Sequence, residues 1–376
     1  MPRDKLRIGI IGIGMIAVRK HVPHLRATGR AEIVAISRRT AAALAQAQTT
    51  LDVPHAFTDW RHMLDADFVP DADFVPDAVV ISTAHHAHAE PAIAALERGL
   101  HVLVEKPMAL TTEDAWAMVE AAQRHDRVLM VGYNMRCTGL WRTVKRALDD
   151  GLVGTVRQVN LAVAYNLTWF WESQTIAPYM QERLATFNMD TFLTTDQPPT
   201  YWRRDPAAMG GGMFADAGSH WVDLALWLGG APPQDVIALT ESAGLTGAIG
   251  LPVDRFVSVQ ARLRNGVLLA LTAADGIADP VSRLTLYGDE GTLTADWGDT
   301  TRVWVHRDGQ IEQLLAGMPD TNPAAAFVDT VLDGAPNLAP PHAGAYAVAL
   351  TQAAYRSAAT GRRVQISESA NQQISA

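Results

Sequence analysis

The chain has 376 residues, 48% of them hydrophobic and 19% charged, and a formal net charge of −9. This length predicts two domains with sizeable buried cores. A negative balance without a long basic run argues against nucleic acid as a partner, and no apolar run is long enough to span a membrane. The single cysteine, Cys137, excludes an internal disulfide, and the first apolar run begins too early to leave room for a secretory signal. We therefore expect a cytoplasmic protein.

Residues 1–132 alternate short apolar runs, which suit strands, with alanine-rich segments, which suit helices. Strands are predicted at 6–12, 31–37, 78–83, 101–105 and 128–132, with helices at 38–49, 89–98 and 111–124. This alternation predicts an α/β domain with a doubly wound parallel sheet. A tandem six-residue repeat over 65–76 is interpreted as a duplication in a surface connection.

Residues 133–376 show a different pattern, in which tight turns separate runs of alternating polarity. Strands are predicted at 155–166, 235–241, 255–264, 267–274, 281–287 and 291–296. This pattern predicts an α+β domain with a large, mostly antiparallel open sheet. A helix at about 343–360 is predicted to pack back towards the first domain. Because an open sheet face needs cover, we expect a homodimer or homotetramer formed through this sheet.

A glycine-rich turn follows the first predicted strand. The order of strand, Gly12-x-Gly14-x-x-Ala17 and helix is the one that a dinucleotide-binding βαβ unit requires. Gly12 permits the tight turn, Gly14 lets the backbone approach a diphosphate, and Ala17 lets the helix pack close to the strand. Met15 and Ile16 begin the helix whose amide groups would hold that diphosphate. The same turn could also be a simple strand-to-helix connection.

Further motifs follow this turn in a fixed order. They are 82–90 at the end of the strand predicted over 78–83, Val104-Glu105-Lys106-Pro107, 132–136, 211–220 and the closing stretch 355–364. Together they resemble the Gfo/Idh/MocA family of oxidoreductases over nearly the whole chain. The resemblance implies an NAD(P)-dependent enzyme with cofactor contacts at Thr83, His85, His88, Glu105, Lys106 and Asn134. Where the family usually has Pro-Asn after the fourth strand, this chain has Ala84-His85.

The end of the second predicted strand indicates which dinucleotide is preferred. Folds that prefer NAD usually place an acidic residue there, which holds the ribose hydroxyls and repels a 2′-phosphate. Here the strand ends in Ser37-Arg38-Arg39, which offers a hydroxyl and two guanidinium groups. We therefore predict NADP, with NAD as the weaker alternative. The arginines could instead be a solvated start of the next helix.

Three closely spaced histidines, His85, His86 and His88, could in principle reach one metal ion. They run from a strand end into a helix at the predicted mouth of the cofactor site. We therefore expect cofactor contacts there and no metal.

Lys106 is the first candidate for catalysis. It follows an apolar strand, at the edge where ligands of open α/β sheets bind, and Pro107 prevents the strand from continuing. Hydride transfer from a carbinol needs a group that handles the hydroxyl proton, and an ammonium can stabilise the developing alkoxide. The alternative for Lys106 is a surface salt bridge with Glu105.

A second polar cluster lies in the other domain. If 216–228 is helical, Asp216, His220, Asp223 and Trp227 share one face, and the carboxylate could orient the imidazole. By resemblance, Asp216 and His220 correspond to the family's substrate-binding aspartate and catalytic histidine, which makes His220 the proton donor or acceptor. The alternatives are a helix N-cap for Asp216 and a satisfied core histidine for His220. The glycines at 210–212 would let substrate or backbone come close.

The sequence indicates the residues of the substrate site less clearly than those of the cofactor site. Six tryptophans lie between 141 and 227, where aromatic faces could contact sugar rings or could be core residues. They are Trp141, Trp169, Trp171, Trp202, Trp221 and Trp227. Polar groups available to the substrate are Asn166, Arg203, Asp216 and His220, with Tyr133 and Arg136 expected to form the wall of the cleft at the domain junction.

These features predict an NADP-dependent oxidoreductase that acts on a secondary alcohol, ketone or aldehyde of a sugar, sugar derivative or cyclitol. Lys106 and His220 would handle the proton. A glycosidase that uses transient oxidation by a tightly held nicotinamide is one alternative. A non-catalytic sugar sensor of the same fold is another, although it would need neither Lys106 nor His220.

Overall fold

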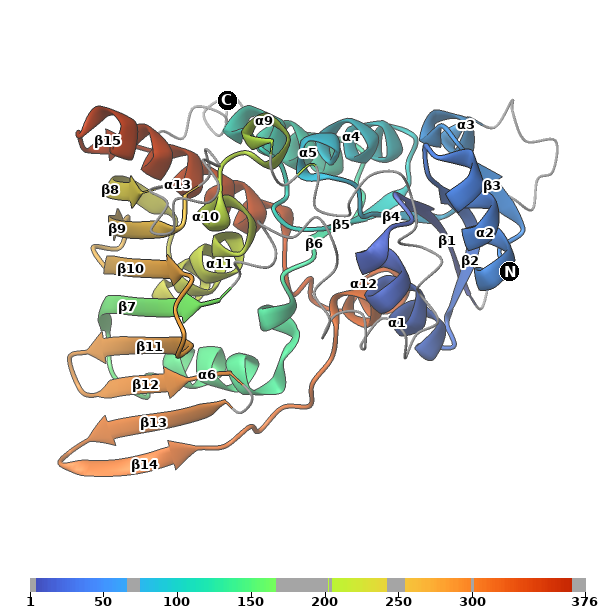
Figure 1. Ribbon diagram of the computed structural model, residues 1–376. Helices are drawn as coiled ribbons and strands as arrows, with labels where there is room; N and C mark the ends of the chain where they lie inside the picture. Colours follow the sequence, from blue (N-terminus) through green and yellow to red (C-terminus); the bar gives the residue numbers. More distant parts are fainter. Residues whose placement is uncertain are drawn as a thin grey trace.

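The computed structural model describes residues 5–65, 75–166, 202, 205–241, 254–298 and 301–366. These residues form a six-stranded sheet and a nine-stranded sheet, with helices α10 and α11 between them (Figure 1). In the described part, no helix is both long enough and apolar enough to cross a membrane. The tandem repeat lies mostly outside the described residues.

The six-stranded sheet is parallel throughout, as the alternating pattern predicted. Its strands are β1 (Leu6–Ile11), β2 (Ala31–Ser37), β3 (His55–Phe57), β4 (Ala78–Ile81), β5 (His101–Val104) and β6 (Leu129–Val131). Their order, β3-β2-β1-β4-β5-β6, reverses direction between β1 and β4. In such a sheet the crevice beyond the carboxyl ends at this reversal is the place where ligands bind.

Short helices connect these strands. They are η1 (Ala17–His21), α1 (Val22–Ala27), α2 (Ala41–Leu51), α3 (Trp60–Leu64), η3 (His85–Ala87), α4 (Ala89–Glu97) and α5 (Thr112–Arg124). The predicted helices at 89–98 and 111–124 are confirmed, and Thr111 caps α5 by accepting a hydrogen bond from Asp114 N at 3.0 Å. β3 was missed because it has only three residues and none of them is buried.

The nine-stranded sheet is antiparallel except where β7 pairs with β10. Its strands are β7 (Val156–Tyr165), β8 (Pro233–Glu241), β9 (Phe256–Leu263), β10 (Leu268–Asp275), β11 (Val281–Gly288), β12 (Thr292–Asp296), β13 (Arg302–Arg307), β14 (Gln310–Leu314) and β15 (Val364–Gln365). The mostly antiparallel sheet is thus confirmed. Strands β13 and β14 were not predicted, because β14 is exposed along most of its length and carries no alternating pattern.

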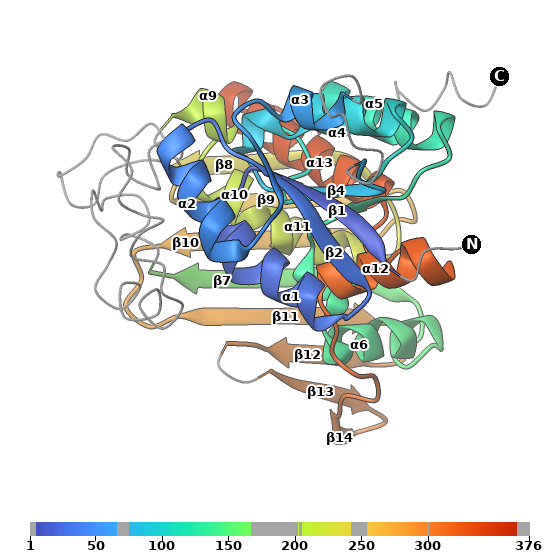
Figure 2. The ribbon, with the colours of Figure 1, turned by 90° about the vertical axis from the view of Figure 1, so that its right-hand side faces the viewer.

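The remaining helices connect or cover the sheets. They are η4 (Asn134–Cys137), α6 (Gly139–Asp149), α9 (Pro206–Met209), α10 (Met213–Asp216), α11 (Gly218–Gly229), α12 (Pro323–Asp333) and α13 (Pro341–Thr360). α12 returns to the first sheet, where it packs against α1, β5 and β6 (Figures 1 and 2). α13 contacts both α5 and β8, so the end of the chain joins the two sheets.

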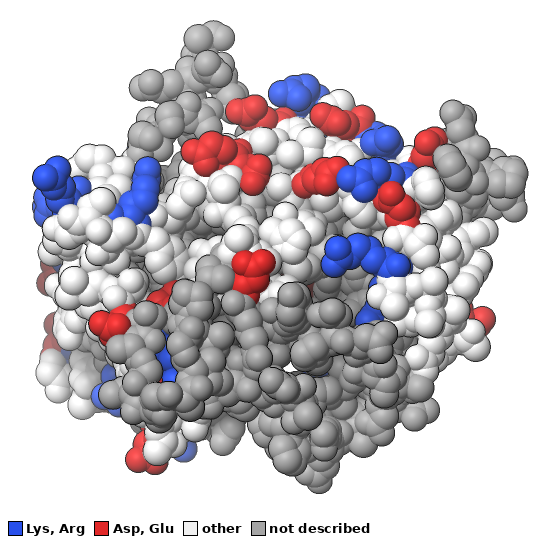
Figure 3. Space-filling view, turned by 45° about the horizontal axis from the view of Figure 1, so that its top comes forward, with Lys and Arg blue, Asp and Glu red and all other residues white. Residues whose placement is uncertain are grey.

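Charged side chains of both signs are interspersed on the face shown in Figure 3. Among the described residues of that face, lysine and arginine lie beside aspartate and glutamate, and no extended basic patch forms.

Candidate active site

A cleft of about 990 Å³ runs along the carboxyl ends of the parallel strands and is closed on its other side by residues of the second sheet's helices. Every residue predicted to hold a dinucleotide lines it. They are Gly12, Gly14, Met15, Ile16, Ser37, Arg38, Arg39, Thr83, His85, His88, Glu105, Lys106 and Asn134. Strand ends that are far apart in sequence meet here because parallel strands end at one edge of the sheet.

The glycine turn has the geometry of a diphosphate cradle. Gly12 has a φ of +88°, and a Cβ there would lie 2.7 Å from the Thr83 side chain, so only glycine is tolerated. At Gly14 a Cβ would meet no atom closer than 3.9 Å, because this residue faces the open cleft. Ala17 is fully buried against the strand. The turn therefore leaves room for a ligand at the start of the following helix.

The end of β2 presents two cations and a hydroxyl to the cleft and no carboxylate. Ser37 O accepts hydrogen bonds from Gly12 N at 3.1 Å and from Ile13 N at 2.9 Å, which ties β2 to the glycine turn. Arg38 Nη1 donates to Ile13 O at 3.2 Å, and burial lowers the pKa of this guanidinium. Arg39 is exposed. Both arginines line the cleft beside the turn.

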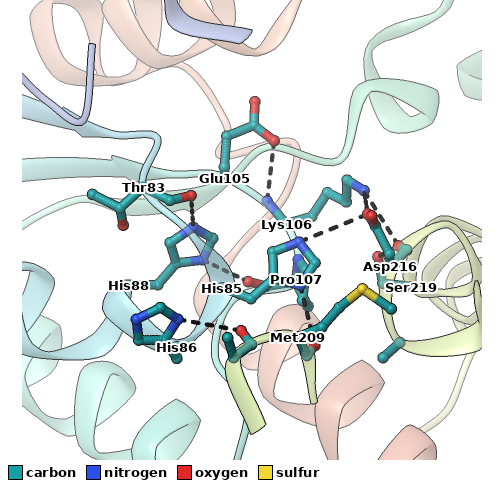
Figure 4. A network of polar contacts seen from close by, with 12 residues as sticks. Thr83, His85, His86, His88, Glu105, Lys106, Pro107, Met209, Asp216 and Ser219 are labelled. Atoms are coloured by element: carbon teal, nitrogen blue, oxygen red, sulfur yellow. Dashed lines mark hydrogen bonds and ion pairs between the residues drawn. The ribbon is translucent and has the colours of Figure 1, made fainter. Parts of the chain in front are cut away.

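Lys106, at the end of β5, does not form a salt bridge with Glu105. Its Nζ donates to Asp216 Oδ1 at 2.7 Å and to Asp216 O at 3.2 Å (Figure 4). Glu105 instead accepts a hydrogen bond from His21 Nε2 at 2.8 Å. Burial alone would raise the pKa of Glu105, but the bond from His21 and the nearby positive charges lower it to about 2. The carboxylate of Glu105 is therefore ionised and paired within the wall of the cleft.

α10 and α11 meet at Ala217, whose backbone is helical (φ −67°, ψ −38°), so the helix predicted over 216–228 is present with a local irregularity. The partners of its side chains differ from those expected. Asp216 ends α10, is 3% exposed and pairs with Lys106. His220 lies on α11, lines the cleft and is half-buried. Its Nδ1 is buried without a hydrogen-bond partner among the described residues, so the expected orienting bond from Asp216 to this nitrogen is not made.

The imidazole of His220 is neutral in this environment. Burial, followed by the positive charge of Lys106, lowers the pKa of its imidazole to about 3. A neutral imidazole can accept a proton. Because Nδ1 is buried, Nε2 is the nitrogen left to meet a ligand in the cleft.

His85 reaches the same carboxylate from the other side. Its Nε2 lies 3.7 Å from Asp216 Oδ1, and its Nδ1 is 3.2 Å from Met209 O (Figure 4). The ring also packs edge-on against Trp202, with the ring centroids 4.5 Å apart. Where the family usually has Asn, this chain thus places an imidazole that joins the Lys106–Asp216 pair.

The other two histidines of this loop bind backbone carbonyl groups. The His88 ring lies between Pro107 O at 2.8 Å and Thr83 O at 3.2 Å, and burial lowers its pKa. His86 Nδ1 is 3.3 Å from Ala208 O. The described residues contain no group of three or more histidine, cysteine or carboxylate side chains that could hold a metal ion. These rings connect the loop after β4 to the loop after β5 and to α9.

Three residues predicted to contact substrate do not line the cleft. Arg136 is 6% exposed and forms a bidentate pair with Asp223, which fixes α11 against η4. Tyr133 is 1% exposed and lines a separate cavity of about 30 Å³, with no partner for its hydroxyl among the described residues. Asn166 is exposed at the end of β7, outside the cleft.

Among the described tryptophans that could contact substrate, one lines the cleft and others belong to the core. Trp202 lines the cleft, whereas Trp141 and Trp221 are buried and pack against aromatic rings of the core. The Arg136 guanidinium lies over the Trp227 ring, with its central carbon 5.0 Å from the ring centroid. Trp169, Trp171 and Arg203 lie outside the described residues.

The structure adds cleft residues that the sequence analysis missed. Among them are Lys20, His21, His24, Thr58, Trp60, Thr138 and the segment 320–324. The last group begins α12, where Asn322 caps the helix by accepting a hydrogen bond from Ala325 N at 3.0 Å. The Asn-Pro pair at 322–323 signals a helix start, but nothing local shows that this helix returns to the first sheet.

Residues 6–133 match a family model described as an oxidoreductase family with an NAD-binding Rossmann fold. Residues 183–294 match the GFO/IDH/MocA C-terminal domain, and the two matches together cover more than half of the chain. The chain belongs to the Gfo/Idh/MocA family. The cleft described above lies at the edge of the sheet in the matched Rossmann domain of this Gfo/Idh/MocA chain.

Two relatives and one solved structure of another protein align with this Gfo/Idh/MocA chain over nearly its whole length. A 1,5-anhydro-D-fructose reductase of Ensifer adhaerens is 27% identical over 96% of this chain and 98% of its own. A myo-inositol 2-dehydrogenase of Thermotoga maritima is 24% identical over 96% of this chain and 99% of its own. The structure of a levoglucosan dehydrogenase with NADH and levoglucosan is 21% identical, with a TM-score of 0.77 over 97% of this chain and 100% of its own. This last similarity shows the shared fold.

Proposed function

We propose that this chain is an NADP-dependent oxidoreductase that transfers a hydride between the nicotinamide and a secondary alcohol, ketone or aldehyde of a sugar, sugar derivative or cyclitol. The observation that carries the proposal is the meeting of Lys106, Asp216 and His220 at the wall of the dinucleotide cleft. The substrate class is supported by the relatives, which are named as an anhydrofructose reductase and an inositol dehydrogenase.

The cleft fits a dinucleotide. A side chain at Gly14 would project into open space of the cleft, and that space is where a diphosphate would approach the backbone amide groups. Bound NADP would supply the hydride acceptor in oxidation, and NADPH the donor in reduction. Glu105 and Asn134, which line the same cleft, would lie towards the nicotinamide end.

The protein's own residues would handle the proton. Two donor positions of Lys106 Nζ are engaged by Asp216, which leaves the third for a substrate oxygen. There the ammonium would stabilise negative charge that develops on this oxygen. Neutral His220 would accept the hydroxyl proton at Nε2 during oxidation and return it during reduction. Asp216 would hold Lys106 in place and keep a negative charge beside it.

The preference for NADP rests on the end of β2. Arg38 and Arg39 line the cleft, and Arg38 is already held over the glycine turn by its bond to Ile13 O. A 2′-phosphate there would gain charge-assisted hydrogen bonds, whereas the hydroxyls of NAD would not. We propose residues 1–132 as the dinucleotide-binding domain and 133–376 as the substrate domain.

Initial rates with a panel of substrates test this proposal. Purified protein is assayed with NADPH against 1,5-anhydro-D-fructose and other ketosugars, and with NADP against levoglucosan, myo-inositol and aldoses. Turnover with at least one of these, with a higher kcat/KM for NADPH than for NADH, supports the proposal. A higher kcat/KM for NADH would overturn the choice of cofactor. Cleavage of nitrophenyl glycosides without a net change in cofactor absorbance would indicate the glycosidase instead.

We also propose that the chain forms a homodimer or homotetramer through the nine-stranded sheet. The helices that pack on this sheet lie on the side facing the first domain (Figure 1). The other face exposes large apolar side chains, which are Ile237, Leu239, Leu268, Val281 and Tyr287. Contact with a second copy would cover this face.

A further inference from the structure

The short helix α10, which ends in Asp216, is held at its start by a carboxylate from a distant part of the chain. Asp254, which precedes β9, accepts hydrogen bonds from Gly212 N at 2.7 Å and Phe214 N at 2.9 Å through its two side-chain oxygens. Its backbone oxygen accepts a third from Met213 N at 3.1 Å. α10 has no side-chain cap of its own, because its N-cap residue is Gly212. Asp254 therefore caps the N-terminus of α10.

Tyr355, on α13, completes this arrangement. Its hydroxyl accepts hydrogen bonds from Gly212 N and Ala215 N, both at 3.1 Å, and donates to Asp254 Oδ1 at 2.5 Å. The four successive amide groups of residues 212–215 are thus bound by two residues from other elements, three of them by side chains and that of Met213 by the backbone oxygen of Asp254. Asp254 is 7% exposed, and neither residue lines the dinucleotide cleft.

Gly211 and Gly212 make room for this pair, which is the close approach of backbone that the sequence analysis gave as one of two possibilities. A Cβ on Gly211 would lie 2.4 Å from Tyr355 Oη, and one on Gly212 would lie 2.3 Å from Asp254 N. Both distances are too short for any side chain. The glycine run therefore lets Asp254 and Tyr355 approach the backbone.

We propose that Asp254 and Tyr355 are positioning residues for the reaction proposed above, because they fix α10 so that Asp216 can hold Lys106. This inference rests on the proposed function. α10 has only four residues, and Asp216 is its last, so a shift of the helix start moves the carboxylate directly. Lys106 comes from the other sheet, and its 2.7 Å bond to Asp216 would not survive a displacement of about 1 Å.

The test uses full-length Tyr355→Phe and Asp254→Asn, assayed with NADPH and the best substrate of the panel. We expect kcat to fall about 10- to 100-fold, which is the loss expected from misplacing a catalytic group. The Kd for NADPH should stay within about twofold of wild type, because the glycine turn is untouched. The matched control is Tyr346→Phe, on the same helix, whose hydroxyl has no hydrogen-bond partner among the described residues and whose removal should leave kcat unchanged.

Two further readouts separate positioning from a general loss of stability. Since both side chains act through the same amide groups, the double variant should lose no more than about twofold in kcat beyond the worse single variant. Amide hydrogen exchange of the peptide over 210–217 should rise in both variants, while exchange of β1 stays as in wild type. The exchange measurement needs no substrate, so it tests the clamping of α10 even if the proposed function fails.

Unchanged kcat in Tyr355→Phe, with faster exchange at 210–217, would overturn the positioning role. Unchanged exchange at 210–217 would show that the pair does not hold α10. A parallel fall in kcat and in NADPH affinity would also contradict the proposal, because it would place the effect on the whole fold.

Discussion

The hydrogen bond between His21 and Glu105 makes the stability of this protein dependent on pH. The pKa of Glu105 is lowered from 4.5 to about 2 in the folded protein. The side chain is 17% exposed, so solvent screening is limited. A difference of about 2.5 pKa units corresponds to roughly 3 kcal/mol of stability in favour of the folded state when Glu105 is ionised.

The sign follows from proton binding. Below pH 4.5 the unfolded chain takes up a proton at this site before the folded protein does, so stability falls as the pH drops towards 2. Glu105 contributes roughly 3 kcal/mol to the free energy of unfolding at neutral pH, and about 2 kcal/mol of this contribution is lost by pH 3. Glu105→Gln keeps the shape and an acceptor oxygen but removes this titration.

Urea unfolding of wild type and Glu105→Gln, followed by tryptophan fluorescence at pH 7 and at pH 3, measures this effect. Distant carboxyl groups titrate equally in both proteins, so the difference in unfolding free energy reports Glu105 together with its partner His21. We expect the wild type to be more stable by roughly 3 kcal/mol at pH 7 and by about 1 kcal/mol at pH 3. A difference that is the same at both pH values would refute the reasoning.

Three further predictions concern the cleft and the sheet. His220→Asn should lower kcat by about 100-fold or more with an unchanged Kd for NADPH, measured by fluorescence titration, and wild-type turnover would contradict the assignment. The double variant Arg38→Asp, Arg39→Asp should lower kcat/KM for NADPH by about 10- to 100-fold and leave kcat/KM for NADH unchanged. The control is Arg98→Asp, at an exposed arginine. An equal loss of kcat/KM for both cofactors would count against a phosphate site. Leu239→Asp, at a residue that is 71% exposed, should shift sedimentation towards the monomer, and an unchanged oligomer would place the interface elsewhere.

The fold and the cofactor half of the site could be predicted because their signals are local. The parallel strands carry continuous apolar runs, and the glycine turn follows β1 directly. Parallel strands end at one edge, so residues such as Thr83 and Lys106 had to meet there whatever the details of the loops. Lys106 was predicted to lie in the cleft, and it does, whereas the alternative of a salt bridge with Glu105 is not found among the described residues. Its pairing with Asp216 had no signal in the neighbouring sequence.

The substrate half could not be predicted because it depends on contacts between distant segments. The helix over 216–228 was expected to place Asp216 over His220, but the carboxylate turns to Lys106, which comes from a distant element. Arg136 was expected in the cleft, yet it is buried because Asp223 neutralises its charge. The role of Asp254 had no local signal at all, since it lies about forty residues after the amide groups that it binds.

The most direct test of the central claim is the transfer of deuterium from NADPH labelled at C4 of the nicotinamide, followed by mass spectrometry of the product. With wild-type protein and the substrate panel, we predict deuterium on the carbinol carbon of at least one product. Lys106→Met and His220→Asn should bind NADPH as tightly but transfer the label at least about 100-fold more slowly. Transfer at the wild-type rate in either variant, or no transfer by a wild-type protein that binds NADPH, would contradict the account.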